Sequence, residues 1–359
     1  MVTTSSHGTL LPSYQALLAM QAICYTAPKT FEVKSIPIPD VRSDQVLVKV
    51  SYCGICGSDR HIIEGRIGEN AGWPITPGHE VVGKIVKVGA DVSGFSEGDR
   101  VVIDPLARCE QCFFCRRGMP VQCSGTIVLG WTVSGGFAEY VVATSSNVYK
   151  IYNVTDEEAT LIEPTSCAVH AVDKLGLKVG SEVLVLGAGP SGLMLSQICK
   201  VNGASRVVLA SNKGMKMDMA KQIGAADEYL ELDRNSAEEQ WKAFKAANPY
   251  GFDAVVEATG STEIANDSIN FVRRGGTLLL YGFYGSGLVH WPPSKIFGDE
   301  IQIIGAIGQH RAFARAVAYV DGGKVNVKGL VTHTYTHHQF QDAVDKLLSR
   351  DVMKIAVKP

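Results

Sequence analysis

Four cysteines lie within one stretch of fifteen residues, CEQCFFCRRGMPVQC, with the spacing C-x2-C-x2-C-x7-C. Short C-x2-C steps let one loop direct several sulfur atoms to a single point, and four thiolates complete the tetrahedral coordination that zinc prefers. Because four protein ligands leave no open position for a substrate, we predict a structural zinc site. Its ligands would be Cys109, Cys112, Cys115 and Cys123. An iron–sulfur cluster, which also binds four thiolates, and unligated surface thiols are the alternatives.

Disulfide bonds fit this chain poorly, because its nine cysteines are an odd number. The first 19 residues are rich in Ser and Thr but lack the basic region and long apolar run of a signal peptide. We expect these residues, 1–19, to form an extension before the folded part of the chain, and we expect a cytoplasmic protein. In that reducing compartment, clustered cysteines are metal ligands or catalytic groups more often than disulfides.

A glycine-rich turn follows the apolar run 183–186. Gly187, Gly189 and Gly192 form G-x-G-x-x-G, a helical stretch comes next, and a second apolar run covers 206–210. This order predicts a β-α-β unit, in which the glycines allow a tight turn, close approach of the backbone to a pyrophosphate and close helix packing. The helix N-terminus attracts the anion. The motif therefore predicts a dinucleotide site.

The end of the second strand bears on which dinucleotide binds. An acidic residue there commonly takes the ribose 2′-hydroxyl of NAD. This chain has Ser211 at that place, followed by Asn212, Lys213 and Lys216. A carboxylate would repel a 2′-phosphate, whereas a hydroxyl, an amide and two ammonium groups would bind it. We therefore predict NADP; the alternative is that the lysines are ordinary solvated residues and NAD is used.

Further apolar runs at 252–260 and 275–283, with helical stretches between them, predict an α/β fold with a doubly wound parallel sheet. Thr259 ends one of these runs and is expected to face the dinucleotide crevice. A chain of 359 residues is too long for one ordinary core, so two domains are expected.

Composition excludes some partners. The formal net charge is −2 with basic and acidic residues scattered, so no basic stripe indicates nucleic-acid binding. No apolar run reaches the roughly 18 residues that a membrane span needs. We therefore expect neither nucleic acid nor membrane as a partner.

Three separate fragments contain further metal-binding side chains: YCGICGSDRH (52–61), PGHE (77–80) and IEP (162–164). With the four-cysteine segment and G-x-G-x-x-G, the order and spacing of G-I-C-G-S-D and G-H-E resemble the zinc-dependent medium-chain alcohol dehydrogenases. The stretch LIEPTSCAVHA is similar to the sorbitol (polyol) dehydrogenase branch. The resemblance covers about residues 20–359.

The resemblance implies a second, catalytic zinc, and therefore two zinc ions per chain. Its ligands would be Cys56, His79 and Glu163, with Glu80 beside the metal as a direct or water-mediated ligand. Three protein ligands and one open position make a Lewis-acid site. Two rivals do not need such a site: a zinc-free quinone or enoyl reductase of the same fold, which would lack Cys56 and His79, and a non-catalytic dinucleotide-binding protein, which could tolerate an incomplete one.

The resemblance also implies a proton relay, with Ser58 near the alcohol and His61 nearer to solvent. Histidine suits this role because it titrates near neutral pH; the alternative for His61 is a supporting or surface histidine. Asp59 is expected to orient His79.

The family fold implied is a GroES-like β-barrel catalytic domain over 20–165 and 309–359, with a Rossmann cofactor domain over 166–308. The chain would form a homodimer or homotetramer. It would move a hydride reversibly between a secondary alcohol, with a pentitol such as D-arabinitol or xylitol favoured, and NADP. Sorbitol, threonine, glucose and diols stay open, because Gly308 and Gln309 replace the Arg-Tyr pair of sorbitol dehydrogenases; Gln309, His310 or Arg311 is a candidate substitute.

Overall fold

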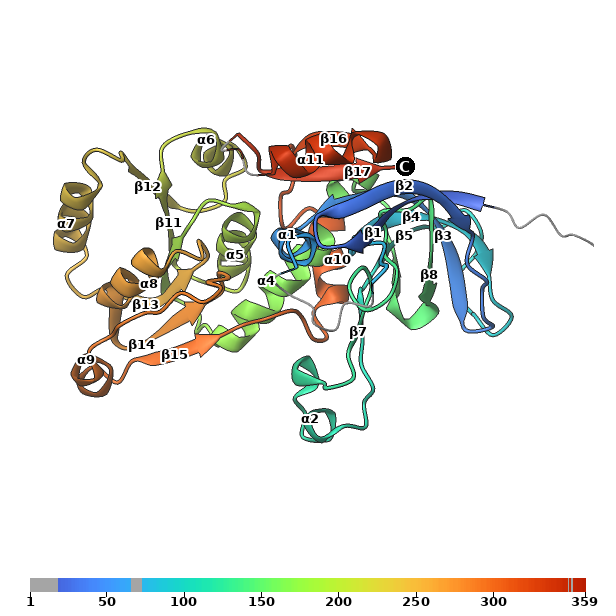
Figure 1. Ribbon diagram of the computed structural model, residues 1–359. Helices are drawn as coiled ribbons and strands as arrows, with labels where there is room; N and C mark the ends of the chain where they lie inside the picture. Colours follow the sequence, from blue (N-terminus) through green and yellow to red (C-terminus); the bar gives the residue numbers. More distant parts are fainter. Residues whose placement is uncertain (1–18, 66–72, 348, 350) are drawn as a thin grey trace, which may run out of the picture.

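The computed structural model describes residues 19–65, 73–347, 349 and 351–359, and Figure 1 shows two sheets side by side with helices between them. The predicted N-terminal extension lies outside the described residues except for Ala19. Among the described residues, no helix is both long enough and apolar enough to cross a membrane.

One sheet has six strands, all parallel, in the order β12-β11-β10-β13-β14-β15. The strands are β10 (Glu182–Leu186), β11 (Arg206–Asn212), β12 (Glu228–Leu232), β13 (Phe252–Glu257), β14 (Val272–Leu280) and β15 (Gln302–Gly305). This order, which runs outward in both directions from the first strand β10, confirms the predicted doubly wound sheet.

Successive residues of β10 enter cores on opposite faces of this sheet. Val183 and Val185 belong to one hydrophobic cluster, and Leu184 and Leu186 belong to another. Because side chains alternate along a strand, a continuous apolar run is what a strand buried on both faces requires. The helices of this part are α5 (Pro190–Val201), α6 (Met215–Gln222), α7 (Ala237–Ala247), α8 (Thr262–Ser268), the 3-10 turn η3 (Ile269–Phe271) and α9 (Pro293–Gly298).

The second sheet has seven strands, in the order β16-β17-β3-β4-β5-β9, with β8 also paired to β3. They are β3 (Gln45–Ile55), β4 (Glu80–Val88), β5 (Arg100–Ile103), β8 (Tyr140–Thr144), β9 (Val148–Lys150), β16 (Val331–Thr336) and β17 (Lys354–Lys358). Beside them lie the hairpin β1 (Ala19–Ala27) and β2 (Thr30–Pro37), the turns η2 (Ser145–Asn147) and η4 (His337–Gln339), and helices α1 (Gly57–Ile63), α3 (Asp156–Ala159) and α11 (Phe340–Lys346). The last strand of the chain therefore pairs with β3 from its first part.

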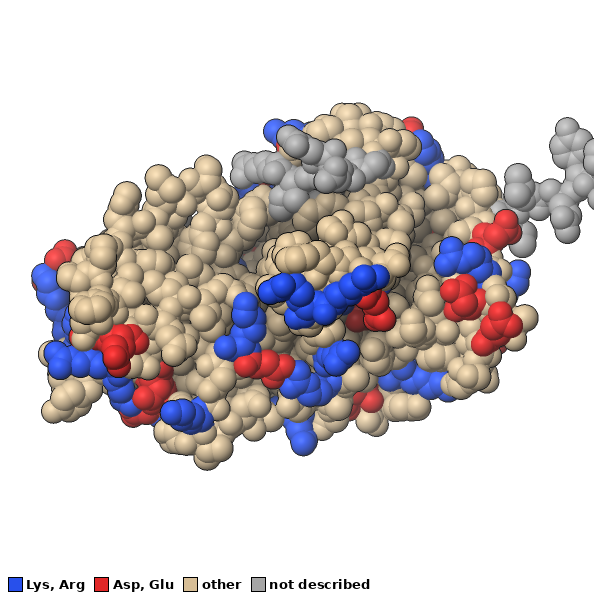
Figure 2. All heavy atoms as spheres, turned by 90° about the horizontal axis from the view of Figure 1, so that it is seen from below, with Lys and Arg blue, Asp and Glu red and all other residues tan. Residues whose placement is uncertain are grey.

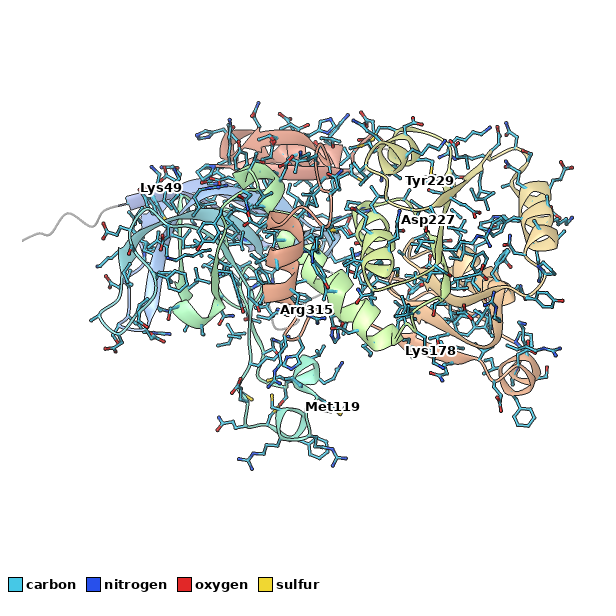
Figure 3. All side chains as sticks on the ribbon, turned by 180° about the vertical axis from the view of Figure 1, so that it is seen from behind. Lys49, Met119, Lys178, Asp227, Tyr229 and Arg315 are labelled. Carbon is cyan, nitrogen blue, oxygen red and sulfur yellow. The ribbon has the colours of Figure 1, made fainter. Side chains whose placement is uncertain are left out.

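Two helices, α4 (Ile162–Leu175) and α10 (Phe313–Asp321), lie between the two sheets. Arg315 on α10, labelled in Figure 3, donates from Nη1 to Oδ1 of Asp173 on α4 at 2.9 Å. A single hydrophobic cluster contains residues of both sheets, including Val82 and Val183, so the two domains share a packed junction. The predicted domain boundaries stay predictions, and α4 runs across the first of them.

The four-cysteine segment forms a lobe that extends away from both sheets, with Met119 at its end (Figures 1 and 3). The lobe consists of β6 (Leu106–Ala107), α2 (Phe113–Arg116), η1 (Pro120–Gln122) and β7 (Ile127–Val128). From below, Lys and Arg side chains gather near the middle of the molecule, but Asp and Glu side chains lie beside them (Figure 2). This face therefore carries mixed charge rather than a continuous basic stripe.

Candidate active site

The metal-binding residues of the first half meet where β3 ends and β4 begins. Cys56 follows β3, and Glu80 is the first residue of β4, with His79 just before it. One ligand atom from each of these three residues lies within 4.8 Å of the others. Antiparallel pairing of β3 with β4 explains why residues more than twenty positions apart come together.

Asp59 contacts both Cys56 and His79 of this group. Its Oδ2 accepts a hydrogen bond from the backbone N–H of Cys56 at 2.8 Å, and its Oδ1 lies 3.3 Å from Nδ1 of His79. Burial alone would lower the pKa of His79, but Asp59 and Cys56 raise that pKa well above its usual value. Asp59 itself is fully buried, so it fixes the ring of His79 with Nε2 turned away from Asp59, as predicted for an orienting residue.

The donor set fits zinc. A cysteine sulfur, an imidazole nitrogen and a carboxylate oxygen are the usual protein ligands of this ion, and three of them leave one position open. Oε1 of Glu80 is buried and has no hydrogen-bond partner among the described residues. A buried carboxylate oxygen without a partner is costly unless something else binds it, and a cation would do so.

Glu163 lies beside this group rather than in it, because the compact set contains Glu80 and not Glu163. Glu163 sits in the first turn of α4, where its Oε1 accepts from Sγ of Cys167 at 3.6 Å. The pKa of Glu163 is raised to about 7, chiefly by burial, with His79 and Lys354 acting to lower it and Glu80 acting to raise it. The structure thus gathers Cys56, His79 and Glu80, with Glu163 next to them.

Lys354, the first residue of β17, is a site residue that no sequence motif predicted. Its Nζ makes an ion pair with Oε2 of Glu80, and the lysine is only 6% exposed. Burial by itself would lower the pKa of Lys354, but Glu80, Cys56 and Glu163 raise it. No motif surrounds this lysine, so only the predicted return of the chain end to the catalytic domain could have suggested it.

Ser58 and His61, the two residues predicted to relay a proton, both lie on α1. Oγ of Ser58 is 3.5 Å from Nε2 of His79. His61, one turn further along α1, packs its ring against Phe283, which follows β14, with the two ring centroids 4.3 Å apart. His61 therefore contacts the cofactor domain, and the metal group lies near the junction of the two domains.

Tyr281 supports this placement and was also missed by the sequence analysis. It follows β14 at the carboxyl end of the parallel sheet, where its backbone N–H donates to the carbonyl of Glu257 at 2.9 Å. Burial, with further contributions from Cys167 and Glu163, raises the pKa of Tyr281 well above its usual value. Glu163 of the metal site therefore lies close enough to affect Tyr281, which follows a strand end of the kind at which α/β sheets bind ligands.

Gly187 and Gly189 lie in the turn between β10 and α5, and Gly192 lies in the first turn of α5. Gly187 has a φ of +109°, which favours glycine, and a Cβ on Gly192 would overlap the carbonyl oxygen of Gly187. Gly189 caps the N-terminus of α5. A Cβ on Gly187 would lie 2.8 Å from Cγ2 of Thr259, whose backbone N–H donates to the buried carboxylate of Glu257 at 2.8 Å. Thr259 therefore lies against the glycine turn.

The four predicted specificity residues lie at and just beyond the carboxyl end of β11. Burial lowers the pKa of Lys216. Nζ of Lys213 is 3.8 Å from Oδ2 of Asp233, a carboxylate that the sequence analysis did not identify. Both partners are largely exposed, and such surface pairs are weak, so Lys213 is free to turn toward an anion.

The four cysteines of the lobe also gather, with all four sulfur atoms within 4.8 Å of one another. Sγ of Cys123 lies 3.4 Å from Sγ of Cys109. None of the nine cysteines forms a disulfide. Four sulfur atoms at one point are what a closed tetrahedral site needs, so the lobe fits a zinc ion that holds its shape.

Gln309 stands at the place of the missing Arg-Tyr pair, and its Oε1 has no hydrogen-bond partner among the described residues. It is fully buried, and its Nε2 donates to Oδ1 of Asp104 at 2.6 Å. Its backbone carbonyl accepts from Nη2 of Arg108, next to the lobe. The side chain thus ties the segment after β15 to the catalytic domain.

Two protein families match the chain. The Alcohol dehydrogenase GroES-like domain matches residues 42–153, and the Zinc-binding dehydrogenase family matches residues 190–321. D-arabinitol dehydrogenase 1 of Uromyces fabae is 54% identical over 341 residues, which cover 95% of this chain and 97% of that protein. Sorbitol dehydrogenase of Halalkalibacterium halodurans is 32% identical over 346 residues, covering 95% and 99%.

Solved structures show the same architecture. That of a candidate zinc-binding dehydrogenase from Sinorhizobium meliloti 1021, bound to NADP, gives a TM-score of 0.88 at 28% identity and covers 95% of this chain and 100% of that one. L-idonate 5-dehydrogenase from Escherichia coli gives 0.85 at 26% identity, covering 95% and 99%. With its two family matches and these relatives, the chain belongs to the zinc-dependent medium-chain alcohol dehydrogenases, in their sorbitol (polyol) dehydrogenase branch.

Proposed function

We propose that this protein oxidises a pentitol, D-arabinitol or xylitol, to the ketose with NADP+, and runs the reverse reduction with NADPH. The observation that carries the proposal is the group Cys56, His79 and Glu80 near the domain junction, where His61 contacts the cofactor domain. The pentitol is supported by the 54% identity to a D-arabinitol dehydrogenase, because this relative matches along nearly its whole length.

Two zinc ions per chain are proposed, one in the four-cysteine lobe and one held by Cys56 and His79 together with Glu80 or Glu163. Zinc at the second site would supply a Lewis acid for the substrate oxygen, and NADP+ would accept the hydride from the carbinol carbon. A secondary alcohol then loses one hydride to the nicotinamide and one proton to water, which leaves the ketone.

The proton is the part of this chemistry that the chain's own residues would handle. Oγ of Ser58, beside Nε2 of His79, would take the hydroxyl proton of the alcohol and pass its own proton outward to His61. His61 lies one turn further along α1 and would release the proton to solvent. Asp59 would keep His79 in place throughout, since its oxygen contacts Nδ1 of that ring.

A panel of alcohols tests the proposal. Initial rates with D-arabinitol, xylitol, sorbitol, threonine, glucose and butanediol, each with NADP+ and NAD+, should be highest for one pentitol with NADP+. Zinc counted per chain in the same sample should be close to two. A protein with two zinc ions that turns over a hexitol or a diol but no pentitol would contradict the substrate and leave the reaction class intact.

Sorbitol is the second candidate substrate, because sorbitol dehydrogenases of two bacteria and two mammals are 32–33% identical to this chain. The absence of the Arg-Tyr pair, whose place is taken by Gly308 and Gln309, argues against it. If a hexitol needs the missing Arg-Tyr pair, a shorter polyol is the better fit.

Replacing Ser211 by aspartate should shift the cofactor preference toward NAD. Ser211 lies at the carboxyl end of β11, where a carboxylate would bind the ribose 2′-hydroxyl and repel a 2′-phosphate. Repulsion between two charges near a protein surface is worth several kcal/mol, so the NADP/NAD ratio of kcat/KM should fall by about 100-fold. Rates with both cofactors measure the ratio.

Ser205→Asp is the matched control, since Ser205 lies before β11 at the opposite end of the same strand. It should leave the ratio unchanged. An unchanged ratio in Ser211→Asp as well would remove Ser211 from the cofactor site.

We also propose that the protein works in the cytosol as a homodimer or homotetramer. Nine cysteines without a disulfide suit a reducing compartment. Beyond β15 the parallel sheet has no further strand among the described residues, and Phe297 and Ile307 nearby are exposed, so this edge suits contact with a second copy. A monomer in light scattering at micromolar concentration would contradict the oligomer.

A further inference from the structure

Three neighbouring strands place a lysine opposite a metal-site carboxylate. Gly54 of β3 pairs with Glu80 of β4 on one side and with Ala356 of β17 on the other. Lys354 comes two residues before Ala356, so its side chain leaves the sheet on the same face. Because Gly54 has no side chain, the lysine and the glutamate can meet above it, and Nζ of Lys354 contacts Oε2 of Glu80.

The space for this ion pair depends on the glycine. A Cβ on Gly54 would overlap Oε2 of Glu80 and lie 3.0 Å from Cε of Lys354. Glu80 is 1% exposed and Lys354 is 6% exposed. Breaking this ion pair would be strongly unfavourable, because it would leave an uncompensated charge in the protein interior.

The ion pair leaves only half of the Glu80 carboxylate available. Oε2 is held by Lys354, while Oε1 has no hydrogen-bond partner among the described residues. One carboxylate oxygen of Glu80 lies within 4.8 Å of the ligand atoms of Cys56 and His79. For a cation bound there, Oε1 of Glu80 is available while Oε2 stays paired with Lys354.

The positive charge of Lys354 also changes the total charge around the metal site. A Cys56 thiolate and the Glu80 carboxylate balance the two positive charges of a zinc ion, and Glu163 beside them adds a third negative charge when it is ionised. This excess of negative charge weakens the attraction of the ion for a substrate oxygen, because Coulomb interactions between charges a few ångströms apart are strong in a buried site. The Lys354 ammonium brings the total to zero.

We propose that Lys354 is a positioning residue of the catalytic site: it restricts Glu80 to one-oxygen contact with the metal and offsets the third negative charge. This inference rests on the proposed function. On this inference, the lysine lowers the affinity for zinc and raises the reactivity of the bound ion. Without Lys354, both oxygens of Glu80 would be available to the metal and its surroundings would be less positive.

Lys354→Met, which keeps the length of the side chain and removes its charge, should therefore change zinc affinity and turnover in opposite directions. The free zinc concentration that half-fills the catalytic site should fall about tenfold, and kcat of the fully zinc-loaded protein should fall about tenfold. Dialysis of the whole protein against zinc buffered by a chelator, with zinc counted per chain, measures the first value. Steady-state rates with D-arabinitol and NADP+ measure the second.

Two variants provide controls. Lys354→Arg keeps the charge, so zinc affinity should change less than in Lys354→Met, although its planar fork can bind both oxygens of Glu80. Lys358→Met removes an exposed lysine from the other end of β17 and should change neither value. A loss of both zinc and turnover in a folded Lys354→Met protein would show a merely structural lysine and overturn the inference, as would no change in either.

If Lys354→Met does not fold, the test moves to a background without the carboxylate charge. Glu80→Gln is compared with Glu80→Gln/Lys354→Met, and removal of the lysine should again tighten zinc binding because its repulsion of the ion is lost. Weaker or equal binding would overturn the inference. A native protein that holds only one zinc ion or oxidises no alcohol contradicts the proposed function instead, so the two failures are distinguishable.

Discussion

Replacing Cys56 by serine should abolish turnover while leaving dinucleotide binding unchanged. Cys56 supplies the only sulfur of the compact metal group, and a serine hydroxyl is a far poorer zinc ligand than a thiolate. Loss of a residue that merely orients a ligand costs about 10- to 100-fold, so loss of the ligand itself should lower kcat/KM by at least about 1,000-fold. Zinc content should fall from two ions per chain to one.

Cys53→Ala is the matched control, because Cys53 is the other cysteine of the same C-x2-C step. It is fully buried, and burial raises its pKa well above the usual value, whereas a zinc ligand must be a thiolate. Cys53→Ala should keep both zinc ions and most of the activity. If Cys56→Ser also lost NADPH binding, measured by nucleotide fluorescence, the metal group and the cofactor site would not be the separate parts that the fold indicates.

The cofactor domain could be predicted from the sequence because its signals are local. The apolar run of β10, the glycine turn and the following helix lie within about twenty residues, and burial on both faces leaves a continuous apolar strand. Gly187 and Gly192 are needed for close backbone contacts that any residue with a side chain would block.

The sheet of the catalytic domain could not be predicted in the same way. Its order depends on the pairing of β17 with β3, which joins residues such as Ile355 and Ile55 from opposite ends of the chain. No local pattern encodes such a pairing, so only the family resemblance suggested that the chain returns to this domain.

The same limit applies within the active site. Cys56, His79 and Glu80 lie in motifs and were predicted, although the resemblance favoured Glu163 as a ligand and the compact group contains Glu80 instead. Lys354 has no motif, because its contact with Glu80 follows from the register of three strands and a glycine between them. Register is a property of the fold and is absent from any single stretch of sequence.

Gly192→Val should have the opposite effect to Cys56→Ser: it should strongly weaken dinucleotide binding and retain both zinc ions. A Cβ at this position would overlap the carbonyl oxygen of Gly187, so the turn before α5 must open. Forcing extra atoms into a packed site costs about 1–3 kcal/mol, and the turn is also the pyrophosphate site, so the Kd for NADPH should rise by about 100-fold or more. Fluorescence titration with NADPH measures it.

Gly298→Val separates this effect from a general intolerance of valine, since a Cβ on Gly298 in α9 would meet no atom within 4 Å. It should bind NADPH as the native protein does. The two losses form a pair: Cys56→Ser keeps the cofactor and loses a metal, and Gly192→Val keeps the metals and loses the cofactor. If the glycine variant also lost its catalytic zinc, the two sites would be coupled through the shared hydrophobic junction, in which Leu193 next to this glycine packs in the same cluster as Val82 of β4.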